Sequence, residues 1–364
     1  MIELDGSHEE GGGQILRTAL GLSVITGRPF RIKGIRKNRK EPGLKQQHVS
    51  CVKACQEFSN AYVEGNKKGS DSLEFVPKQI KGRQMNIDIG TAGSVTLLLQ
   101  SVLLPLMFTE SDIKITGGTD VKWSMSLDYF RNIVIPMLAD LTNIEIKCGR
   151  RGYYPVGNGA VEIRNKPKYR ITDFDNFSRF HQYIFGNPII NLSEVGKLTH
   201  IKGMSHASRN LQNAEVAERQ AKAASLMLQS LSSVTIDTEY SNTDSTGSGI
   251  MVYAIFHAPK NNYYRLGADI TGEKGMKSEE VGRQVSEKIM GYIRQEIVVD
   301  EHLQDNIIPL LGLFGGKIRT GKITKHTLSN IHVCEKFLNV EYEIEKKENQ
   351  IEASFISVLS SSKS

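Results

Sequence analysis

The chain has 364 residues, more than one hydrophobic core usually serves, so we expect two domains or a repeated architecture. Hydrophobic residues make up 39% of it and charged residues 24%, which excludes a disordered or fibrous protein. The net charge of +6 is concentrated in residues 27–48, where eight basic residues face one acid, so the rest of the chain carries −1. This concentration favours a docking site for an anion such as nucleic-acid phosphate, and a solvated surface loop is the alternative.

A pattern of helix, strand, helix, strand and strand recurs three times along the chain. We expect the first copy at residues 13–26, 29–35, 44–58, 61–64 and 73–76. The second copy is expected at residues 94–108, 112–116, 127–141, 143–148 and 160–164. The third copy is expected at residues 305–314, 317–324, 328–338, 340–345 and 351–358. Three similar units predict one pseudo-symmetric body, formed by residues 1–195 and 298–364.

Residues 196–297 interrupt this series with a pattern of their own. It comprises a strand at 200–207, a helix at 214–228, strands at 234–240, 250–256 and 264–270, and a helix at 278–295. We interpret it as a smaller inserted α/β domain. Residues 166–191, rich in aromatic and charged side chains without a clear period, are interpreted as a connector.

A glycine run, EEGGGQ at residues 9–14, follows an expected first strand and opens the first helix. Glycines before a helix let the backbone approach an anion, and the amide groups of the helix terminus attract phosphate. The spacing matches neither a Rossmann nor a P-loop motif, and a plain tight turn is the alternative. Because Glu10, Gln14 and Arg17 follow at i, i+4 and i+7, they share one helix face and suit a phosphate with its divalent metal.

A second polar group flanks the turn at residues 42–43. Arg36 and Arg39 are three residues apart and can clamp phosphate oxygens, with Gln47 beside them. His48 starts the next helix and can join the clamp when protonated, although a satisfied helix histidine is the alternative.

The histidines offer a candidate nucleophile. His326 stands just before the last helix, where a bound phosphate would also meet the helix terminus. His332 lies inside that helix between apolar neighbours and is interpreted as structural. His302, four residues before Asn306, has no obvious partner in the sequence. No HExxH spacing exists, which argues against a zinc hydrolase.

Together these motifs resemble one known family. The runs DGSHEEGGGQILRTALGLSVITGRPF, IRKNRKEPGLKQQH, GTAGSVTLLLQ, GGTD, QDN and HTLSN, in this order along nearly the whole chain, are similar to RNA 3'-terminal phosphate cyclases. The resemblance implies an α+β fold of three repeated βαβαββ units in a pseudo-threefold body, with a smaller inserted α/β domain of similar pattern.

The resemblance also implies an activity. It is the ATP-dependent conversion of an RNA 3'-phosphate to a 2',3'-cyclic phosphodiester, a ligase-type nucleotidyl transfer that forms AMP and pyrophosphate. The implied intermediates are a covalent histidine-AMP and an adenylated RNA end. The implied ligands are ATP, a divalent metal (Mg or Mn) and RNA with a 3'-terminal phosphate, and no oligomeric state is indicated.

Roles for individual residues follow from the same resemblance. His326 matches the catalytic nucleophile, and Glu10 matches the metal-binding carboxylate. The implied ATP-binding residues are Glu10, Gln14, Arg17, Gln100, Tyr129, Asp305 and Asn306. The implied RNA-phosphate-binding residues are Arg36, Arg39, Gln47 and His48. Trp123 and Tyr129 fall in the segment that lines the adenine pocket.

Alternatives remain beside this interpretation. A non-catalytic cyclase-like protein of ribosome assembly would share the fold but lack the nucleophile, and His326 argues against it. An enolpyruvyl transferase would need a second three-unit domain. A plain RNA-binding module explains the basic segment but not the glycine–carboxylate set.

Cysteine usage and hydropathy predict the compartment. The four cysteines form no CxxC pair, which indicates reduced thiols and not a disulfide scaffold or tetrathiolate zinc site. The N-terminus lacks a basic and apolar leader, and the longest apolar stretch, at residues 94–108, is shorter than the roughly 20 residues that a spanning helix needs. We expect a cytoplasmic RNA-processing enzyme without membrane contact.

Overall fold

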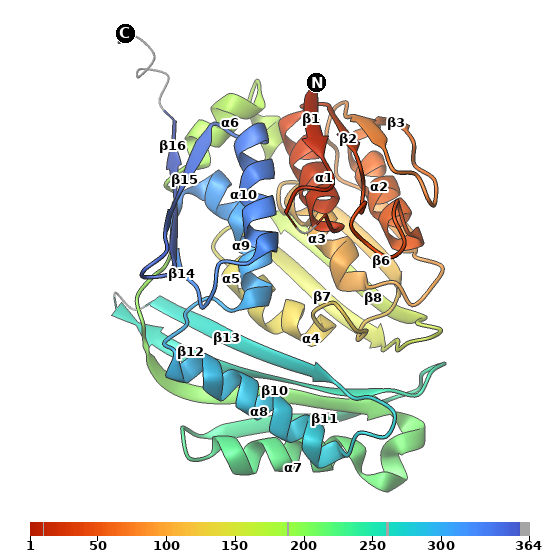
Figure 1. Cartoon of the computed structure of the whole chain (residues 1–364), viewed down its shortest axis with the longest axis vertical. Coiled ribbons are helices and arrows are strands. Elements are labelled where there is room, and N and C mark those ends of the chain that lie inside the picture. The colour runs from red at the N-terminus through yellow and green to blue at the C-terminus, as the bar shows by residue number, and fades with distance from the viewer. Residues whose placement is uncertain (10, 188, 260–261, 357–364) are drawn as a thin grey trace.

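The computed structural model describes residues 1–364 except 10, 188, 260–261, 357–364 and the side chain of 262. Within these residues the fold is mixed α/β, with four four-stranded sheets. Three sheets and the helices between them form an upper body, and the fourth sheet lies beneath it (Figure 1). No helix in this part of the chain is both long and apolar enough to cross a bilayer.

All four sheets share one arrangement, a parallel pair of strands followed by two antiparallel neighbours. The first has the order β1 (Ile2–Asp5), β2 (Phe30–Lys33), β4 (Leu73–Val76), β3 (Tyr62–Glu64). The second has the order β5 (Gln84–Asp88), β6 (Ser111–Gly117), β8 (Gly159–Pro167), β7 (Thr142–Arg150). The third has the order β9 (Ile190–Leu192), β14 (Gly316–Arg319), β16 (Gln350–Phe355), β15 (Val340–Glu345). Residues before and after the fourth sheet therefore pair in the third.

The fourth sheet has the order β11 (Val234–Ser241), β10 (Lys197–Ser208), β12 (Ser248–Ala258), β13 (Asn262–Thr271). Helices α7 (Val216–Leu228) and α8 (Ser278–Arg294) cover the face turned away from the body (Figure 1). Their buried residues, such as Ala224 and Val285, recur at helical spacing and pack on the sheet, which explains the amphipathic pattern of both helices.

The body is built around four helices that contact one another, α1 (Gln14–Thr26), α3 (Val95–Met107), α9 (Glu301–Phe314) and α10 (Lys325–Phe337). Helix α2 (Gln46–Ser59) packs against α1 and α3. Helix α1 is buried on all sides except at Thr26, because α2, α3 and α10 surround it. Its polar residues Gln14 and Arg17 are therefore held inside the molecule, at the end of the helix next to the glycine run.

The expected helix at 127–141 is interrupted. It consists of α4 (Leu127–Tyr129), a π-helical turn (Phe130–Val134) and α5 (Ile135–Met137). Pro136 has no backbone N–H to donate to the carbonyl of Asn132, and Arg265 of β13 donates to that carbonyl instead, at 2.7 Å. The break thus ties the body to the fourth sheet.

The connector at 166–191 has structure of its own. It contains a 3₁₀ turn (Ile171–Asp173), helix α6 (Phe177–Ile184) and strand β9. The fully buried ring of Phe180 packs edge-on against Phe108 at a centroid distance of 5.0 Å. The aromatic residues of this segment therefore contribute to the core of the body.

A buried ionic cluster joins the fourth sheet to the body. Arg151, 1% exposed, lies 3.3 Å from Asp120 and 2.8 Å from Asp128 of the body, and 3.1 Å from Glu239 of β11. His206 of β10 completes the cluster, with Nε2 3.3 Å from Asp120 Oδ1. These charges fix the two parts against each other, and the large cavity described below lies between them.

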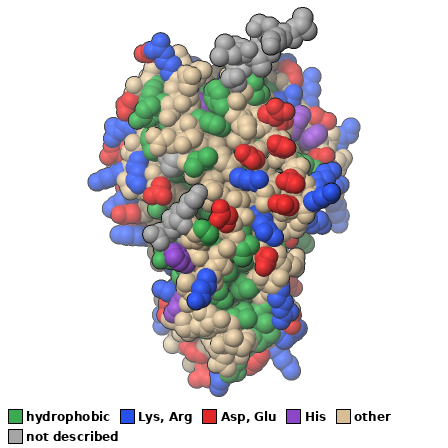
Figure 2. Space-filling view, turned by 90° about the vertical axis from the view of Figure 1, so that its left-hand side faces the viewer, with side chains coloured by type: hydrophobic (Ala, Val, Ile, Leu, Met, Phe, Trp, Pro, Cys, Tyr) green, Lys and Arg blue, Asp and Glu red, His purple; other side chains and the backbone are tan. Residues whose placement is uncertain are grey.

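The outer face of the third sheet is acidic. Figure 2 shows carboxylate side chains gathered with a few basic ones over this side of the molecule. Exposed Glu341 and Glu343 alternate with inward-facing residues along β15, and Glu352 lies beside them on β16. This alternation is typical of a strand with one face in water.

Candidate active site

A cavity of about 1410 Å³ lies between the body and the fourth sheet. Its walls come from the glycine run, α1, α2, α3, α9, α10 and the loops of the fourth sheet. The residues predicted for the site that line it are Gln14, Arg17, Arg36, Arg39, Gln47, His48, Gln100, Asp305 and His326. Residues as far apart in the sequence as Gly13 and His326 thus converge, although no individual element predicts their proximity.

His326 lies in the first turn of α10, and not before the helix as expected. Helix α10 begins earlier because Thr324 caps it, with Oγ1 accepting from the Thr327 amide at 3.0 Å. The imidazole is about one third exposed, and its Nδ1 is 3.1 Å from Asp305 Oδ2. A carboxylate in this position favours the proton on Nδ1, which leaves the lone pair of the imidazole on Nε2. This tautomer is the one that acts as a nucleophile.

Asp305 has a second feature relevant to a bound ligand. Its Oδ1 atom is buried, and no hydrogen-bond partner is found for it among the described residues. Buried carboxylate oxygens are normally satisfied by a donor or a cation. The atom therefore fits a cation or a ligand donor in the cavity.

A polar network connects Asp305, the partner of His326, to the first helix. Arg17 donates to Gln14 at 2.5 Å and to Gln100 at 3.1 Å. Gln14 in turn donates to Asn330 Oδ1 at 3.2 Å, and Asn330 Nδ2 donates to the Asp305 carbonyl at 3.0 Å. The network fixes α1, α9 and α10 relative to one another at the cavity wall. Our sequence interpretation assigned no role to Asn330, although its position four residues after His326 places both on one helix face.

The glycine run is a close-packed part of the wall. A Cβ at Gly13 would lie 2.5 Å from His48 Nε2 and 2.9 Å from Arg17 Nη1, and one at Gly12 would lie 3.1 Å from Arg39 Nη2. Gly11 has a φ of +60°, which disfavours a side chain. Gly13 forms the N-cap of α1 without any side-chain hydrogen bond to the helix amides. Backbone amides, the guanidinium groups of Arg17 and Arg39, and the imidazole of His48 therefore gather around Gly12 and Gly13, as an anion site requires.

His48 is neutral, which corrects the expectation that its charge helps to hold phosphate. Burial, followed by the charges of Arg17, Arg36 and Lys45, lowers the pKa of His48 to about 3. Its Nδ1 accepts a hydrogen bond from the Lys45 amide at 3.0 Å. The proton therefore resides on Nε2, which faces Gly13 and donates as a neutral group.

Arg36 also differs from the expected clamp. Its Nη1 donates to the carbonyls of Glu41 at 2.6 Å and Gly43 at 2.9 Å, and the residue is 9% exposed. Arg36 thus holds the basic loop in shape, while Arg39 approaches the glycine run. Arg36 therefore stabilises the loop, whereas Arg39 is the arginine that lies next to the glycines.

Two residues predicted to bind ATP do not line the cavity. Tyr129 is fully buried and donates to Asp300, and its ring lies edge-on to His302 at 5.2 Å. Asn306 is 5% exposed, donates to the His302 carbonyl at 2.7 Å and lies 3.9 Å from Met125 Sδ. The helix turns that carry Tyr129 and Asn306 direct both side chains into the protein. Tyr129 therefore packs behind His302, and Asn306 lies behind His302 and Met125. Glu10, the predicted metal ligand, lies outside the described residues.

His302 and Met125 form the wall where Tyr129 and Asn306 were expected. His302 has a partner that the sequence did not reveal, Asp269 of β13, 3.3 Å from Nε2. Burial opposes a charge on His302, but the Asp269 carboxylate outweighs it and raises the pKa of the imidazole. His332, interpreted as structural, stacks on His8 at a centroid distance of 4.3 Å.

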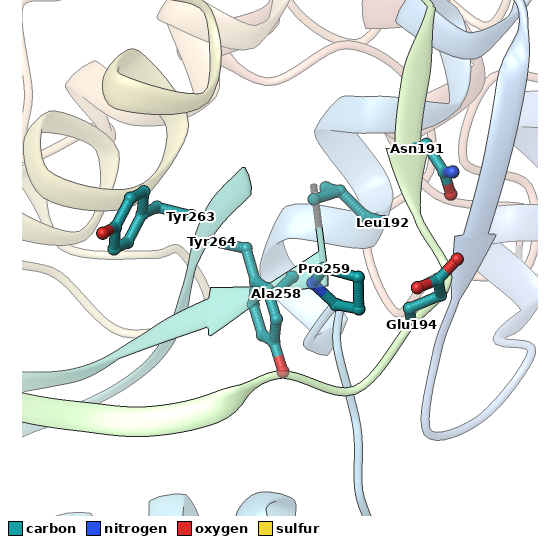
Figure 3. A pocket seen from close by; sticks show the side chains of 7 residues that line it. All are labelled: Asn191, Leu192, Glu194, Ala258, Pro259, Tyr263 and Tyr264. Atoms are coloured by element: carbon teal, nitrogen blue, oxygen red, sulfur yellow. The ribbon is translucent and has the colours of Figure 1, made fainter. Parts of the chain in front are cut away.

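A second hollow lies near the ends of β12 and β13 (Figure 3). Its volume is about 20 Å³, room for a single water. It is lined by Asn191, Leu192, Glu194, Ala258, Pro259, Tyr263 and Tyr264. The hollow offers no described cation or histidine and is too small for a nucleotide.

The ionic cluster contains one group with metal-ligand geometry. Oxygen and nitrogen atoms of Asp120, Asp128 and His206 lie within 4.8 Å of one another. Arg151 already pairs with both carboxylates and Arg131 pairs with Asp128, so two positive charges balance them without a metal ion. The cluster therefore acts as an anchor between the two parts of the molecule.

Comparison with known proteins identifies the family of this chain. Residues 8–344 match the family described as RNA 3'-terminal phosphate cyclase. A Pyrococcus furiosus protein of that name is 42% identical over 348 residues, covering 94% of this chain and 95% of the relative. A Saccharolobus solfataricus protein of the same name is 41% identical over 353 residues, covering 95% and 97%. The chain therefore belongs to the RNA 3'-terminal phosphate cyclase family.

Proposed function

We propose that the protein is an ATP-dependent RNA 3'-terminal phosphate cyclase that acts through a covalent histidine-AMP. The observation that carries this proposal is the His326–Asp305 pair, which lines the same cavity as the glycine run and its basic side chains. The names of the relatives support the overall reaction. The steps below rest on the geometry of this chain.

In the first step, His326 Nε2 attacks the α-phosphorus of ATP. A phosphorus–nitrogen bond forms, the bond to the β-phosphate oxygen breaks, and pyrophosphate leaves. Asp305 accepts the Nδ1–H throughout and stabilises the positive charge that develops on the ring. A nearby carboxylate thus holds the imidazole in the reactive tautomer.

In the second step, an oxygen of the RNA 3'-phosphate attacks the AMP phosphorus and releases His326. The neighbouring 2'-hydroxyl then attacks the RNA phosphorus, its proton is lost, and AMP leaves as the cyclic diester forms. AMP activates the RNA 3'-phosphate, because a phosphate monoester has a poor leaving group until AMP is attached. Ring closure is fast since the hydroxyl is already held beside the phosphorus.

ATP is held by two parts of the cavity. Arg17, Gln14 and Gln100 form a rigid hydrogen-bonded group that contacts its phosphates at the start of α1. The adenine lies against Met125 and His302, which Asn306 and Tyr129 support from behind.

A divalent metal bound by Glu10 would neutralise phosphate charge during adenylation. Within the described residues, the unpartnered Asp305 Oδ1 fits a cation at this place. Arg17 and Gln14 orient the phosphates at the start of α1.

The RNA 3'-phosphate binds beside the basic loop. Arg39 supplies the charge, while Gln47 and neutral His48 donate hydrogen bonds. Arg36 keeps their loop in place. His48 and Arg17 both approach Gly13, so the RNA phosphate and the phosphates of ATP lie next to each other there.

Two further assignments belong to this proposal. Residues 1–195 and 298–364 form the catalytic domain, and residues 196–297 form the inserted domain, because β9 pairs with β14 across the insertion. The four unpaired cysteines fit a reducing cytoplasm.

The proposal is tested by incubating the protein with ATP, Mg²⁺ and an oligoribonucleotide that carries a labelled 3'-phosphate. We expect the label to become resistant to phosphatase, with one AMP formed for each cyclised end. A protein that binds this RNA but neither protects the label nor forms AMP would be a non-catalytic relative, and the proposal would fail.

A further inference from the structure

The chain has a single tryptophan, and its position is unusual. Trp123 lies on the loop between β6 and α4, lines the large cavity, and is 96% exposed. Its backbone adopts a φ of +69°, a left-handed conformation that bulky residues rarely take. An aromatic ring held in solvent at the mouth of a site calls for a ligand that covers it.

The loop that carries Trp123 is held firmly. The Met125 carbonyl accepts from Thr96 at 2.8 Å, and the Ser126 amide donates to Asp269 at 2.7 Å. Lys122 forms an ion pair of 2.7 Å with Glu273 of the fourth sheet. Trp123 therefore projects from a loop fixed at both ends, and its exposure is a property of the fold.

A second exposed aromatic residue lines the same cavity. Tyr154 is 75% exposed, although Tyr153 beside it is buried and hydrogen-bonded to His206 at 2.8 Å. The amide of Val156 is held by Ser245 at 3.0 Å. Tyr154 is thus presented to the cavity by a loop that is anchored to the fourth sheet.

The size and charge of the cavity indicate what covers these rings. Its volume of about 1410 Å³ exceeds the roughly 300–1,000 Å³ of a typical small-molecule site, so it holds more than one nucleotide. Lys45, Lys68, Lys274 and Lys325 line it, whereas the face of the third sheet carries glutamates. Positive charge with interspersed aromatic rings is the pattern that binds single-stranded nucleic acid.

We propose that Trp123 and Tyr154 form a stacking platform for nucleobases of the RNA strand on the 5' side of its terminal phosphate. This inference rests on the proposed cyclase function and adds the subsite that holds the strand. Stacking does not depend on the identity of the base, so the platform accepts any sequence. The adenine of ATP is not the occupant, because it is assigned to Met125 and His302, which line the same cavity and are much less exposed than Trp123.

The single tryptophan provides a direct readout in the full-length protein without ATP. We expect a hexauridylate with a 3'-phosphate to quench Trp123 fluorescence, and a non-hydrolysable α,β-methylene analogue of ATP with Mg²⁺ to leave it unchanged. Quenching by the ATP analogue would reassign Trp123 to the adenine, and no quenching by a bound hexauridylate would overturn the platform.

Kinetics of variants supply the second measurement. Trp123→Ala and Tyr154→Ala should each raise the KM for the hexauridylate about fivefold or more, a larger change than in the rate of AMP labelling from ATP alone. Trp123→Phe should restore most of the loss, because it retains a stacking ring. Tyr62→Ala, at an exposed tyrosine of β3 outside the cavity, is the matched control.

The results separate this inference from the proposed function. Equal loss of AMP labelling and RNA use in Trp123→Ala would overturn the platform but leave the cyclase intact. Absence of AMP labelling in the unaltered protein would overturn the cyclase function, while RNA quenching would still establish the platform.

Discussion

Two histidine–aspartate pairs in this protein have nearly the same geometry and different surroundings. His326 lies 3.1 Å from Asp305, and His206 lies 3.3 Å from Asp120. The first pair is 33% and 17% exposed, whereas the second is 2% and 1% exposed, although Asp120 also borders the cavity. Distance alone therefore does not identify a reactive histidine.

The neighbours of each pair account for the difference. Arg151 supplies a permanent positive charge to Asp120, and Tyr153 bonds the other nitrogen of His206, so buried neighbours hold both members of that pair. Around His326 the neighbouring groups line the cavity. Asp120 Oδ1 and Asp305 Oδ1 both lack a hydrogen-bond partner among the described residues, but His206 lies 3.3 Å from the former. Burial and the charge of Arg151 make the His206–Asp120 pair an anchor. Access to the cavity makes the His326–Asp305 pair suitable for chemistry.

Asp305→Asn removes the carboxylate of the His326–Asp305 pair and keeps nearly the same side-chain shape. An amide does not hold the imidazole in the nucleophilic tautomer, so we expect AMP labelling to slow by about 10²- to 10⁴-fold. The unfolding midpoint should be unchanged. Asp175→Asn, on an exposed helix pair, serves as the control, and an Asp305→Asn protein labelled at the normal rate would contradict the assigned role.

Arg151→Met tests the sealed pair. Removing this charge leaves buried Asp120 without an arginine partner and buried Asp128 with Arg131 alone, so we expect the free energy of unfolding to fall by about 3–5 kcal/mol in urea titrations. Arg219→Met removes an exposed ion pair with Glu279 and should shift the midpoint little. If both variants unfold at the same urea concentration, the cluster is not an anchor.

Arg39→Ala tests whether RNA and ATP are bound by different side chains of the cavity. We expect the KM for RNA to rise about tenfold, because a phosphate contact is lost, and AMP labelling from ATP to change less. Lys40→Ala, an exposed neighbour that does not line the cavity, is the matched control. Equal loss of both steps would contradict the assignment of Arg39 to the RNA phosphate.

His48→Gln gives the smallest effect and a distinct pH dependence. The pKa of His48 is about 3 in the folded protein and near 6.5 when unfolded, so only the unfolded chain takes up this proton as the pH falls from 6.5. Stability is therefore lost toward acid, by at most about 1.4 kcal/mol for each pH unit. The variant should show a shallower slope between pH 6.5 and 4, and His257→Gln, at an exposed ring, should not.

Much of the fold follows from local pattern. The apolar run expected as a helix at 94–108 forms α3 (Val95–Met107), and the strand expected at 340–345 has those bounds. Strand β5 was missed because its burial alternates only weakly at a sheet edge. Strand β9 has three residues, and its partner β14 lies more than 120 residues away, so no local signal predicts it.

The site, like the fold, has some features that follow from the local sequence and others that do not. Motif residues such as Gln14, Arg17 and His326 meet at the cavity as expected. The inward direction of Tyr129 depends on its bond to Asp300, and the neutral state of His48 depends on burial beside three cations. Such properties arise from contacts between distant segments and are absent from any single stretch of sequence.

The central claim is tested most directly by mapping the covalent adduct. The protein is incubated with Mg²⁺ and ATP labelled at the α-phosphate, digested without acid, and the labelled peptide is sequenced. The account predicts an acid-labile AMP on the peptide that contains His326, and its loss in a folded His326→Ala protein. AMP on another residue, or full labelling of His326→Ala, would contradict it.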